Sequence, residues 1–548
     1  MAKLNIPVGV SDFAELRSNG YYYVDKSGLI REMLTSSAAK VTLITRPRRF
    51  GKTLGMSMLE NFFNIRKNSE KLFENLEISG NRELCDQWMN QWPVIFFSLK
   101  DIDGLDFQSA YDRLVVQLSN LCKMHVYLLQ SEAIDPDDKK VFLELKAGTA
   151  SEAQVGFSLN TLMRMMESYY RKPVILLLDE YDVPLAKASS NGYYKEMLSV
   201  IKGMMSTALK DNPFLKFAII TGCLKIAKES IFTGTNNLVS DTITDTRLNE
   251  YFGFIQKDVE QILRDAGSID HLERVKSWYD GYSFEKEKSI YSPRSVVNCM
   301  RFEKIENYWN QTETFEALQF YIDMNFDGLK DDVLSMIAGE KVPVNTGSFT
   351  NDMTTFRTED DVLTLLIHLG YLGYDSNEKC VFIPNNEIRS EYVNAVSVSD
   401  WGEVSQALKN SADILNAIWQ RRPEQVAEGI RQAHFETSHI QYNDENALSY
   451  TISLALYAAR NFYTVHRELA GGKGFADMVY IPRKKYPEKP ALVVELKWDK
   501  SAAGAISQIK EKEYCQSLEE YQGNLLLVGI NYDVKTKEHS CVIEEFVK

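Results

Sequence analysis

The chain has 548 residues, of which 44% are hydrophobic and 25% are charged. This length suits three or four domains of roughly 100–200 residues each, and the composition excludes a disordered or fibrous chain. The net charge of -14 excludes bulk attraction to nucleic acid or to an anionic membrane, so any phosphate binding has to be local. The longest apolar stretches, such as 174–178, are far shorter than the ~18 residues of a membrane span.

The cysteines and the first residues indicate in which cellular compartment the protein works. Seven cysteines are scattered along the chain, and none forms a CxxC pair. This spacing predicts neither a disulfide framework nor a zinc site, and it fits a reducing environment. The first residues contain no apolar segment of the kind found in signal peptides. We therefore expect a cytoplasmic protein that is not embedded in a membrane.

The first half of the chain alternates short apolar runs with helical patterns. Strands are expected at 40–45, 94–99, 174–178 and 217–220. Apolar strands that alternate with helices are typical of a parallel sheet covered on both faces, so the overall class is α/β. Residues 255–300 are expected to be mostly helical and to form a lid.

The second half shows two further patterns. Between 314 and 395, helices precede a turn and a strand at 380–383, and a helix followed by a β-hairpin is typical of a winged helix. From about 440 onward, helices flank strands that we expect at 476–481, 491–496 and 524–530, which together form another α/β unit. The predicted domains are 1–254, 255–313, 314–400 and 401–548.

The end of the first expected strand carries an incomplete phosphate-loop pattern. Gly51, Lys52 and Thr53 supply the second half of GxxxxGK[ST], whereas Arg46 stands at the position of the first glycine. The bland alternative is a basic surface turn. The segment lies between a hydrophobic strand and an amphipathic helix, which is the context in which backbone N–H groups hold phosphates. The position therefore favours a phosphate loop.

An acidic pair supports this interpretation. Asp179 and Glu180 follow the apolar strand at 174–178, where one carboxylate can organise Mg²⁺ together with Thr53 and the next can act as a base for the attacking water. A solvated acidic turn is the alternative. Because the pair occurs together with the phosphate loop, we predict nucleotide binding. The long stretch between Lys52 and Asp179 predicts an inserted helical region.

Four segments carry a resemblance to a known family. They are YVDK at 23–26, RPRRFGKT at 46–53, LDEYD at 178–182 and WYDGY at 278–282. With these motifs the chain resembles, over nearly its whole length, bacterial AAA-ATPase-like proteins that carry a C-terminal PD-(D/E)XK nuclease-like domain. The resemblance implies that Arg46 is a usual residue of this loop and that Thr221 contacts the γ-phosphate.

The expected fold is a P-loop NTPase parallel sheet with a helical lid, a winged-helix-like middle region and a C-terminal restriction-endonuclease-like α/β domain. ATP and Mg²⁺ are the expected cofactors. The residues expected to bind the nucleotide are Arg49, Phe50, Gly51, Lys52, Thr53, Asp179 and Thr221.

Several side chains near the loop keep more than one interpretation. Arg48 and Arg49 either bind phosphate, reach a neighbouring subunit or face solvent, and the roles of Lys225 and Lys228 are open. Tyr23 either stacks on adenine or is a buried anchor. The aromatic cluster at 278–282 either packs between lid and sheet, which we favour, or senses nucleotide.

A second set of charged residues lies near the C-terminus. Asp477 and the ExK sequence of Glu495 and Lys497 fall on two adjacent expected strands. Residues two apart in a strand face the same side, so Glu495 and Lys497 project together. Two carboxylates can hold a hard cation that activates water, and the lysine can steady the developing charge. The alternative is a charged strand edge.

The family resemblance extends to this region. It implies catalytic roles for Glu468, which precedes a glycine-rich segment, and for Gln508 on the following helix, beside Asp477, Glu495 and Lys497. It also includes a tyrosine on that helix, here Tyr514. One departure is Phe475, which stands where family members often carry arginine.

Two functions remain in view. The first is an ATP-driven, Mg²⁺-dependent nuclease acting on DNA or RNA, in genome defence or mobile-element control. The second is a nucleotide-switched protein that binds a partner or nucleic acid without cutting it. The candidate catalytic residues favour the first. The type of nucleic acid, a homo-oligomeric state and the pathway are left open.

Overall fold

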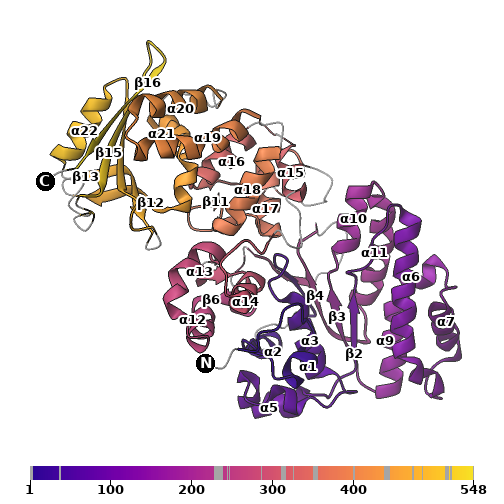
Figure 1. The fold of residues 1–548 in the computed structure, drawn as a ribbon. Helices are drawn as coiled ribbons and strands as arrows, with labels where there is room; N and C mark the ends of the chain where they lie inside the picture. Colours follow the sequence, from indigo (N-terminus) through magenta and orange to yellow (C-terminus); the bar gives the residue numbers. More distant parts are fainter. Residues whose placement is uncertain are drawn as a thin grey trace. The chain divides into compact units, whose positions relative to one another are not determined.

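The computed structural model divides into two compact units. The first unit contains residues 1–312 and 343–388, and the second contains 313–342 and 389–548 (Figure 1). The described residues are 4–546 except 36–38, 227–237, 244, 246, 285–286, 310–315, 325, 327, 348, 350–355, 399–401, 437–444, 472–473, 484–485, 513–517, 519–520 and 522. The domain boundaries expected from the sequence stay a prediction.

A five-stranded parallel sheet forms the centre of the first unit. Its strands are β1 (Val41–Thr45), β2 (Val94–Ser98), β3 (Val174–Asp179), β4 (Leu215–Gly222) and β5 (Leu238–Asp241). Their order is β2-β3-β4-β1-β5, and every neighbouring pair is parallel. The four strands expected from apolar runs are confirmed, and the prediction of a parallel α/β sheet is confirmed with them. The edge strand β5 was not expected.

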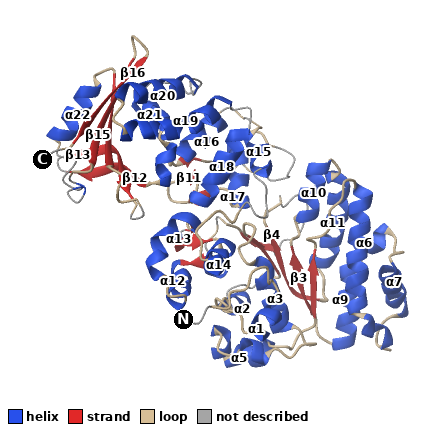
Figure 2. Ribbon diagram, viewed as in Figure 1, coloured by secondary structure: helices blue, strands red, loops and turns tan. Residues whose placement is uncertain are grey.

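Helices cover both faces of this sheet (Figure 2). They are α1 (Phe13–Ser18), α2 (Gly28–Thr35), α3 (Lys52–Phe63), α4 (Glu70–Phe73), α5 (Arg82–Trp88), α6 (Phe107–Met124), α7 (Pro136–Ala147), α8 (Glu152–Gly156), α9 (Ser158–Tyr170), α10 (Val183–Asn191) and α11 (Tyr194–Leu209). Alternate residues of β3 enter two cores, because successive side chains of a strand point to opposite faces. Leu176 packs with α6 and α11, whereas Ile175 packs with α1 and α3.

The remainder of the first unit contains helices and two small sheets. The segment 254–302 holds β6 (Phe254–Ile255), α12 (Gln256–Asp265), α13 (Leu272–Tyr279), β7 (Tyr282–Phe284), β8 (Glu287–Tyr291) and α14 (Pro293–Phe302). The expected helices are therefore joined by a three-stranded antiparallel sheet, β6-β8-β7. Further along, α17 (Glu359–Leu369) precedes a hairpin of β10 (Gly373–Asp375) and β11 (Cys380–Phe382), as the helix-then-hairpin pattern predicted.

The second unit is built on a mixed five-stranded sheet. Its strands β12 (Tyr463–Gly471), β13 (Gly474–Pro482), β14 (Ala491–Trp498), β15 (Leu525–Asp533) and β16 (Glu538–Glu545) lie in sequence order. Only the β14–β15 pair is parallel, because α22 (Ala502–Glu511) crosses over between these two strands. The expected C-terminal α/β fold is confirmed. The strands β12 and β16 were not expected.

Helices on one face of this sheet are α19 (Gly402–Trp419), α20 (Pro423–Glu436) and α21 (Glu445–Ala455), with the short helix η5 (Tyr457–Asn461). The unit also contains α15 (Glu316–Ile322) and α16 (Leu329–Ala338), of which α16 contacts α21. Leu492 and Val494 of β14 pack with α19, α20 and α21, whereas Val493 packs with α22 on the other face. Two elements, β9 (Val342–Pro343) and α18 (Asn386–Val398), span the division between the units.

Candidate functional site

The phosphate loop connects β1 to α3 and contains two residues in the left-handed region. Arg49 has φ +70° and Gly51 has φ +85°. Gly51 is the N-cap of α3, and no atom lies within 4 Å of the place where a Cβ would stand. Glycine is favoured here because of the backbone conformation, not because of crowding. The open side of the loop and the helix N-terminus together form a region suited to an anion.

Lys52 lies folded over this loop. Its ammonium donates hydrogen bonds to the carbonyls of Arg46 (2.9 Å) and Pro47 (2.8 Å), and its Nζ lies 3.5 Å from the sulfur of Cys223. The side chain is only 6% exposed. A lysine held in this way places its charge at the centre of the loop, where phosphate oxygens are expected.

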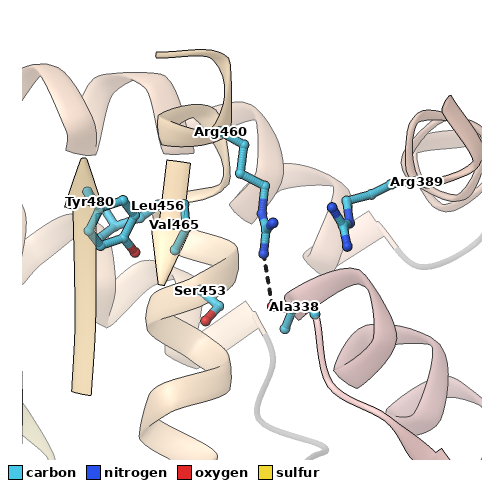
Figure 3. A pocket seen from close by; sticks show the side chains of 8 residues that line it. Ala338, Arg389, Ser453, Leu456, Arg460, Val465 and Tyr480 are labelled. Carbon is cyan, nitrogen blue, oxygen red and sulfur yellow. Dashed lines mark hydrogen bonds between the residues drawn. The ribbon is translucent and has the colours of Figure 1, made fainter. Parts of the chain in front are cut away.

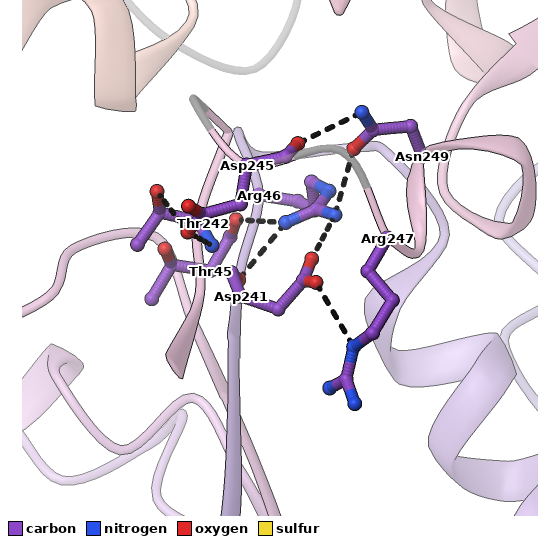
Figure 4. Close-up of polar contacts among 7 residues, drawn as sticks. All are labelled: Thr45, Arg46, Asp241, Thr242, Asp245, Arg247 and Asn249. Atoms are coloured by element: carbon purple, nitrogen blue, oxygen red, sulfur yellow. Dashed lines mark hydrogen bonds and ion pairs between the residues drawn. The ribbon is translucent and has the colours of Figure 1, made fainter. Parts of the chain in front are cut away.

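Arg46 does not face the loop, although it occupies the position of the first glycine. Its guanidinium is fully buried, donates to the carbonyls of Thr45 (2.8 Å) and Asp241 (3.0 Å), and forms an ion pair with the Asp241 carboxylate (Figure 4). Asn249 accepts a further bond at 3.0 Å, and Arg247 approaches the other oxygen of Asp241 at 3.5 Å. Arg46 therefore ties the end of β1 to the end of β5, and its partner Asp241 could not be identified from the sequence.

Asp179 brings three elements together at the carboxyl end of β3. Thr53, on α3, donates its hydroxyl to Oδ2 of Asp179 at 2.8 Å, and Thr221, on β4, donates to Oδ1. The Asp179 side chain is completely buried. A hydroxyl and a carboxylate side by side at a phosphate loop are the hard oxygen ligands that Mg²⁺ prefers. The two predicted magnesium ligands, Thr53 and Asp179, thus lie in direct contact and fit this ion.

Glu180 has a strained backbone conformation. Its φ is +55°, a conformation that a non-glycine residue adopts at a cost of about 1–3 kcal/mol. Burial raises the pKa of its carboxyl above the usual value, and the nearby Asp179 raises it further, whereas Lys52 and Arg48 lower it. The carboxyl therefore lies among the charges of the predicted nucleotide site.

Tyr181 and Asp182, the next two residues of the acidic motif, form hydrogen bonds to the backbone that follows β4. Asp182 accepts hydrogen bonds from the backbone N–H groups of Cys223 (2.9 Å) and Leu224 (2.8 Å). Tyr181 donates its hydroxyl to the carbonyl of Leu224 at 2.8 Å. They fix the segment that follows Thr221. Neither role is evident from the LDEYD motif in which both residues stand.

The aromatic cluster at 278–282 packs against the phosphate loop. The ring of Phe50 makes an edge contact with Tyr282, with 5.0 Å between centroids, and the Tyr282 hydroxyl donates to the Gly370 carbonyl at 2.9 Å. Tyr23 lies against Phe13, with centroids 5.5 Å apart. Both arrangements agree with the packing interpretations of these aromatic residues.

In the second unit, Asp477 on β13 and Glu495 on β14 lie on neighbouring antiparallel strands. Asp477 accepts a hydrogen bond from the backbone N–H of Leu496 at 2.7 Å. Glu495 accepts at Oε1 from Lys497 Nζ at 2.9 Å and from the side-chain amide of Gln508 on α22. The structure thus brings together four of the five residues predicted for this site.

The electrostatics of Glu495 suit a cation. Its side chain is 1% exposed, and burial, together with the charge of Asp477, raises its pKa to about 7. Its second oxygen, Oε2, is buried without a hydrogen-bond partner among the described residues. An unsatisfied carboxylate oxygen beside a second carboxylate is an arrangement that a hard divalent cation would complete. The two carboxylates therefore fit Mg²⁺ or Mn²⁺.

Some predicted residues lie outside the described part of the chain. Glu468 lies on β12, but its side chain is not described, and Lys228 and Tyr514 lie outside the described residues altogether. Among the described residues there is no group of three or more His, Cys, Asp or Glu side chains that could hold a metal ion. No helix in the described ranges is both long and apolar enough to cross a membrane.

The fold and these two sites define a protein that joins a P-loop nucleotide domain to a nuclease-like domain. Residues 7–232 match the family model described as predicted AAA-ATPase, and residues 445–542 match that of the PD-(D/E)XK nuclease superfamily. These two regions are thus similar to the AAA-ATPase-like family and to the PD-(D/E)XK nuclease superfamily, which confirms the resemblance found in the sequence.

A curated relative shares part of the chain. The chain is 26% identical over 318 residues to a protein of Azotobacter chroococcum mcd 1 described as an uncharacterized protein in the vnfD 5′ region. The match covers 57% of this chain and 55% of that relative, so the chain spans about half the length of the curated relative it matches.

Proposed function

We propose that the protein binds and hydrolyses ATP and that its C-terminal domain is a metal-dependent nuclease acting on DNA or RNA. The observation that carries the proposal is the contact of Thr53 and Thr221 with the buried Asp179, at the end of a loop that holds Lys52. This arrangement supports ATP and Mg²⁺ as cofactors. A homo-oligomeric assembly, a cytoplasmic location and a winged helix at 314–400 are part of the same proposal.

Several residues of the phosphate loop have a role in binding. The backbone N–H groups of Phe50 and Gly51 and the N-terminus of α3 face the phosphates, and Lys52 releases its loop carbonyls to contact phosphate oxygens. Thr53 and Asp179 would hold Mg²⁺, which would supply positive charge beside the phosphates. Thr221 contacts the γ-phosphate from the end of β4. Arg49 is also among the residues that we propose to bind the nucleotide.

Glu180 is the general base of the proposed hydrolysis. Its desolvated carboxyl has a raised pKa, which makes it a stronger base than an exposed glutamate. Its carboxyl interacts with the charges of Lys52 and Arg48, which both belong to the phosphate loop. It would accept a proton from the water that attacks the γ-phosphate.

The second site supports hydrolysis of a phosphodiester. Asp477 and Glu495 would hold a divalent cation, which would supply an activated water and positive charge beside the phosphate. Lys497 steadies the charge that develops on the phosphorus oxygens, and Gln508 orients Glu495 through its side-chain amide. Glu468, from β12, completes the proposed set. Defence against foreign nucleic acid or control of mobile elements would use such a nucleotide-gated nuclease.

A second function is favoured by one observation. Glu495 already forms an ion pair with Lys497 and accepts a bond from Gln508, so this site is partly satisfied without a cation. In this alternative the protein is a nucleotide-switched binding protein, and its nuclease-like domain recognises a partner without cutting it.

A cleavage assay separates these two functions. The full chain is incubated with single- and double-stranded DNA and RNA, with Mg²⁺ or Mn²⁺, and with or without ATP. We expect cleavage by the parent protein, none by Glu495→Gln, and unchanged cleavage by Glu488→Gln, a matched control at an exposed position before β14. Lys52→Ala should lose ATP binding and, with it, any dependence of cleavage on ATP. A parent protein that cuts none of these substrates would support the binding alternative.

A further inference from the structure

The parallel sheet of the first unit carries cations and aromatic rings along its amino-terminal edge. The strands β1, β2, β3 and β4 are parallel, so their amino ends lie on the edge opposite the one from which the phosphate loop leaves. Lys40 directly precedes β1, Lys172 lies two residues before β3, and Lys216 is the second residue of β4. Trp92 lies two residues before β2. The sheet thus brings together residues from four separate parts of the chain.

Two of these lysines lie over aromatic rings. The ammonium of Lys216 is 4.6 Å from the ring centroid of Trp92 and 5.4 Å from that of Trp88. The ammonium of Lys172 is 5.6 Å from the Trp92 centroid. The two indole rings are stacked on each other, with centroids 5.0 Å apart. All four side chains are half-buried, so each keeps a part in contact with solvent.

A further cation and two tyrosines extend this edge. The backbone N–H of Ile65 donates to the carbonyl of Trp92 at 2.8 Å, which brings the next residue, Arg66, close to the amino end of β2. The guanidinium of the exposed Arg66 lies 4.5 Å from the ring centroid of Tyr127. Tyr127 makes a T-shaped contact with Tyr169, which is 43% exposed and belongs to the last turn of α9. We call the cations Lys40, Arg66, Lys172 and Lys216, together with the rings beside them, the basic edge.

The positive charge of the basic edge is not paired with carboxylates. Among the described residues, none of its four cations forms an ion pair. Lys40 and Lys172 donate to the backbone carbonyls of Leu215 and Gln91, the latter at 3.0 Å, and each ammonium has three donors. Burial lowers the pKa of Lys40, and the nearby charge of Lys216 lowers it further. Because the whole chain carries a net charge of -14, this edge is a local exception.

Arginines elsewhere in the chain have internal roles instead. Arg46 pairs with the buried Asp241. In the second unit, Arg460 donates to the carbonyl of Ala338 at 3.0 Å and so joins η5 to the end of α16, beside a pocket that Arg389 also borders (Figure 3). That pocket has a volume of about 230 Å³, enough for a few water molecules at about 30 Å³ each but not for a polymer. The basic edge instead follows four neighbouring strands, which span roughly 14 Å at about 4.8 Å between strands.

We propose that the basic edge binds single-stranded nucleic acid, with its cations at the phosphates and its aromatic rings against unpaired bases. Surfaces that bind single strands combine positive charge along the backbone with aromatic rings on which bases of any kind stack. An acidic protein segment would use the charges but not the rings, and the bases of a duplex are already stacked on one another. The inference rests on the proposed function, in which nucleic acid is the substrate of the second unit.

The test measures binding apart from cleavage. The full chain carrying Glu495→Gln is titrated, in EDTA and without ATP, into a fluorescently labelled oligothymidylate of about 15 nucleotides, and anisotropy is followed at several salt concentrations. We expect saturable binding that weakens as salt rises. The double variant Lys172→Gln with Lys216→Gln should bind about tenfold or more weakly. It should also reduce the slope of log affinity against log salt by about 1.4, at about 0.7 for each phosphate contact on a single strand.

Matched variants separate this site from general charge and from misfolding. Lys140→Gln with Lys257→Gln, which changes two exposed lysines elsewhere in the first unit, should bind as the starting protein does. Tyr169→Ala should weaken binding severalfold without changing the salt slope, because it removes a ring and no charge. If the Lys172 and Lys216 double variant does not fold, Arg66→Gln, at an exposed position, should still weaken binding and reduce the salt slope by about 0.7.

Two results would overturn the proposal. One is an affinity and a salt slope that stay unchanged in both Arg66→Gln and the double lysine variant. The other is displacement of the oligothymidylate by poly-L-glutamate as effectively as by unlabelled oligothymidylate, which would indicate an acidic protein partner. Cleavage by the parent chain with Mg²⁺ is assayed separately. Binding at the basic edge without cleavage would contradict only the proposed nuclease, whereas cleavage together with unchanged binding in the edge variants would contradict only the basic edge.

Discussion

The guanidinium of Arg49 lies over the indole ring of Trp309, 4.9 Å from its centroid, and donates a hydrogen bond to the Trp309 carbonyl at 2.8 Å. Arg49 belongs to the phosphate loop, whereas Trp309 follows α14 and is itself 1% exposed. This contact connects the loop to the segment that follows α14, in addition to the contact of Phe50 with Tyr282. The sequence left open whether Arg49 binds phosphate, reaches a neighbouring subunit or faces solvent. In the structure its guanidinium packs inside the protein against Trp309 and does not simply face solvent.

Replacement of Arg49 tests this contact. Arg49→Ala should lower the free energy of unfolding by about 1–3 kcal/mol, because it removes a desolvated cation–π contact and a hydrogen bond. Arg48→Ala, at the exposed neighbouring position, should change it by less than about 0.5 kcal/mol. Urea denaturation gives both values, and ATP titration of the same variants shows whether Arg49 also binds phosphate. Equal effects of the two variants on stability would contradict the structural role.

Arg46→Gly would restore the strict phosphate-loop pattern and should nevertheless damage the protein. The change leaves the Asp241 carboxylate buried without its principal ion-pair partner, and breaking a buried pair costs about 3–5 kcal/mol. Thermal unfolding of the full chain measures this loss. The double variant Arg46→Gly with Asp241→Asn should recover part of it, because no unpaired charge then remains. A stable Arg46→Gly single variant would show that Arg46 has no anchoring role.

Glu180→Gln should bind ATP with nearly parental affinity and hydrolyse it roughly 10²-fold more slowly or worse, since an amide cannot accept the proton of the attacking water. Steady-state phosphate release measures turnover, and a fluorescent ATP analogue measures binding. Glu196→Gln, at an exposed position of α11, is the matched control. Unchanged turnover in Glu180→Gln would remove this residue from the proposed mechanism.

Two substitutions in the carboxylate site should distinguish a residue that binds the metal from a residue that only places a charge beside it. Asp477→Asn should abolish cleavage and weaken Mn²⁺ binding, because it removes an anionic ligand. Lys497→Ala should also stop cleavage but leave Mn²⁺ binding equal or tighter, because it removes the positive charge that pairs with Glu495. Calorimetric titration of Mn²⁺ into chains that carry Lys52→Ala avoids the nucleotide site. Parallel losses of metal binding in the two variants would contradict this assignment.

The stability of the protein should depend on pH through Glu387. This buried carboxyl accepts hydrogen bonds from Ser295 and from the backbone of Tyr308 and Trp309, yet burial raises its pKa to about 7. Below pH about 4.5 the carboxyl is protonated in both the folded and unfolded states. Between that pH and about 7, only the unfolded state releases the proton. Stability should therefore fall across this window, by up to about 3 kcal/mol, and then level off.

Glu387→Gln provides the control for this pH dependence. The amide cannot ionise, so the contribution of this position should be flat from pH 5 to 8, and the variant should gain on the parent as pH rises. Urea denaturation at several pH values measures the difference. Equal pH profiles of the two proteins would show that Glu387 does not titrate in this range.

The sequence by itself determined the local arrangement of both proposed sites. The apolar run before RPRRFGKT and the helical pattern after it specify strand, loop and helix, and the apolar strand before Asp179 specifies where the acidic residues emerge. In the C-terminal domain, the two-residue period of a strand places Glu495 and Lys497 on one face. These inferences succeed because they depend on neighbours in the chain.

The tertiary structure decided which distant residues complete these sites. Nothing local to Arg46 identifies Asp241, and nothing local to Arg49 identifies Trp309. The first contact forms only when the sheet assembles, and the second only when the segment after α14 packs against the loop. The edge strands β12 and β16 were missed for a related reason. Edge strands carry polar and exposed residues, so strand pairing reveals them where a hydrophobic pattern does not. The sequence determines which functional groups each segment carries. Tertiary packing determines which distant side chains contact these groups, and burial determines the pKa of their carboxyls.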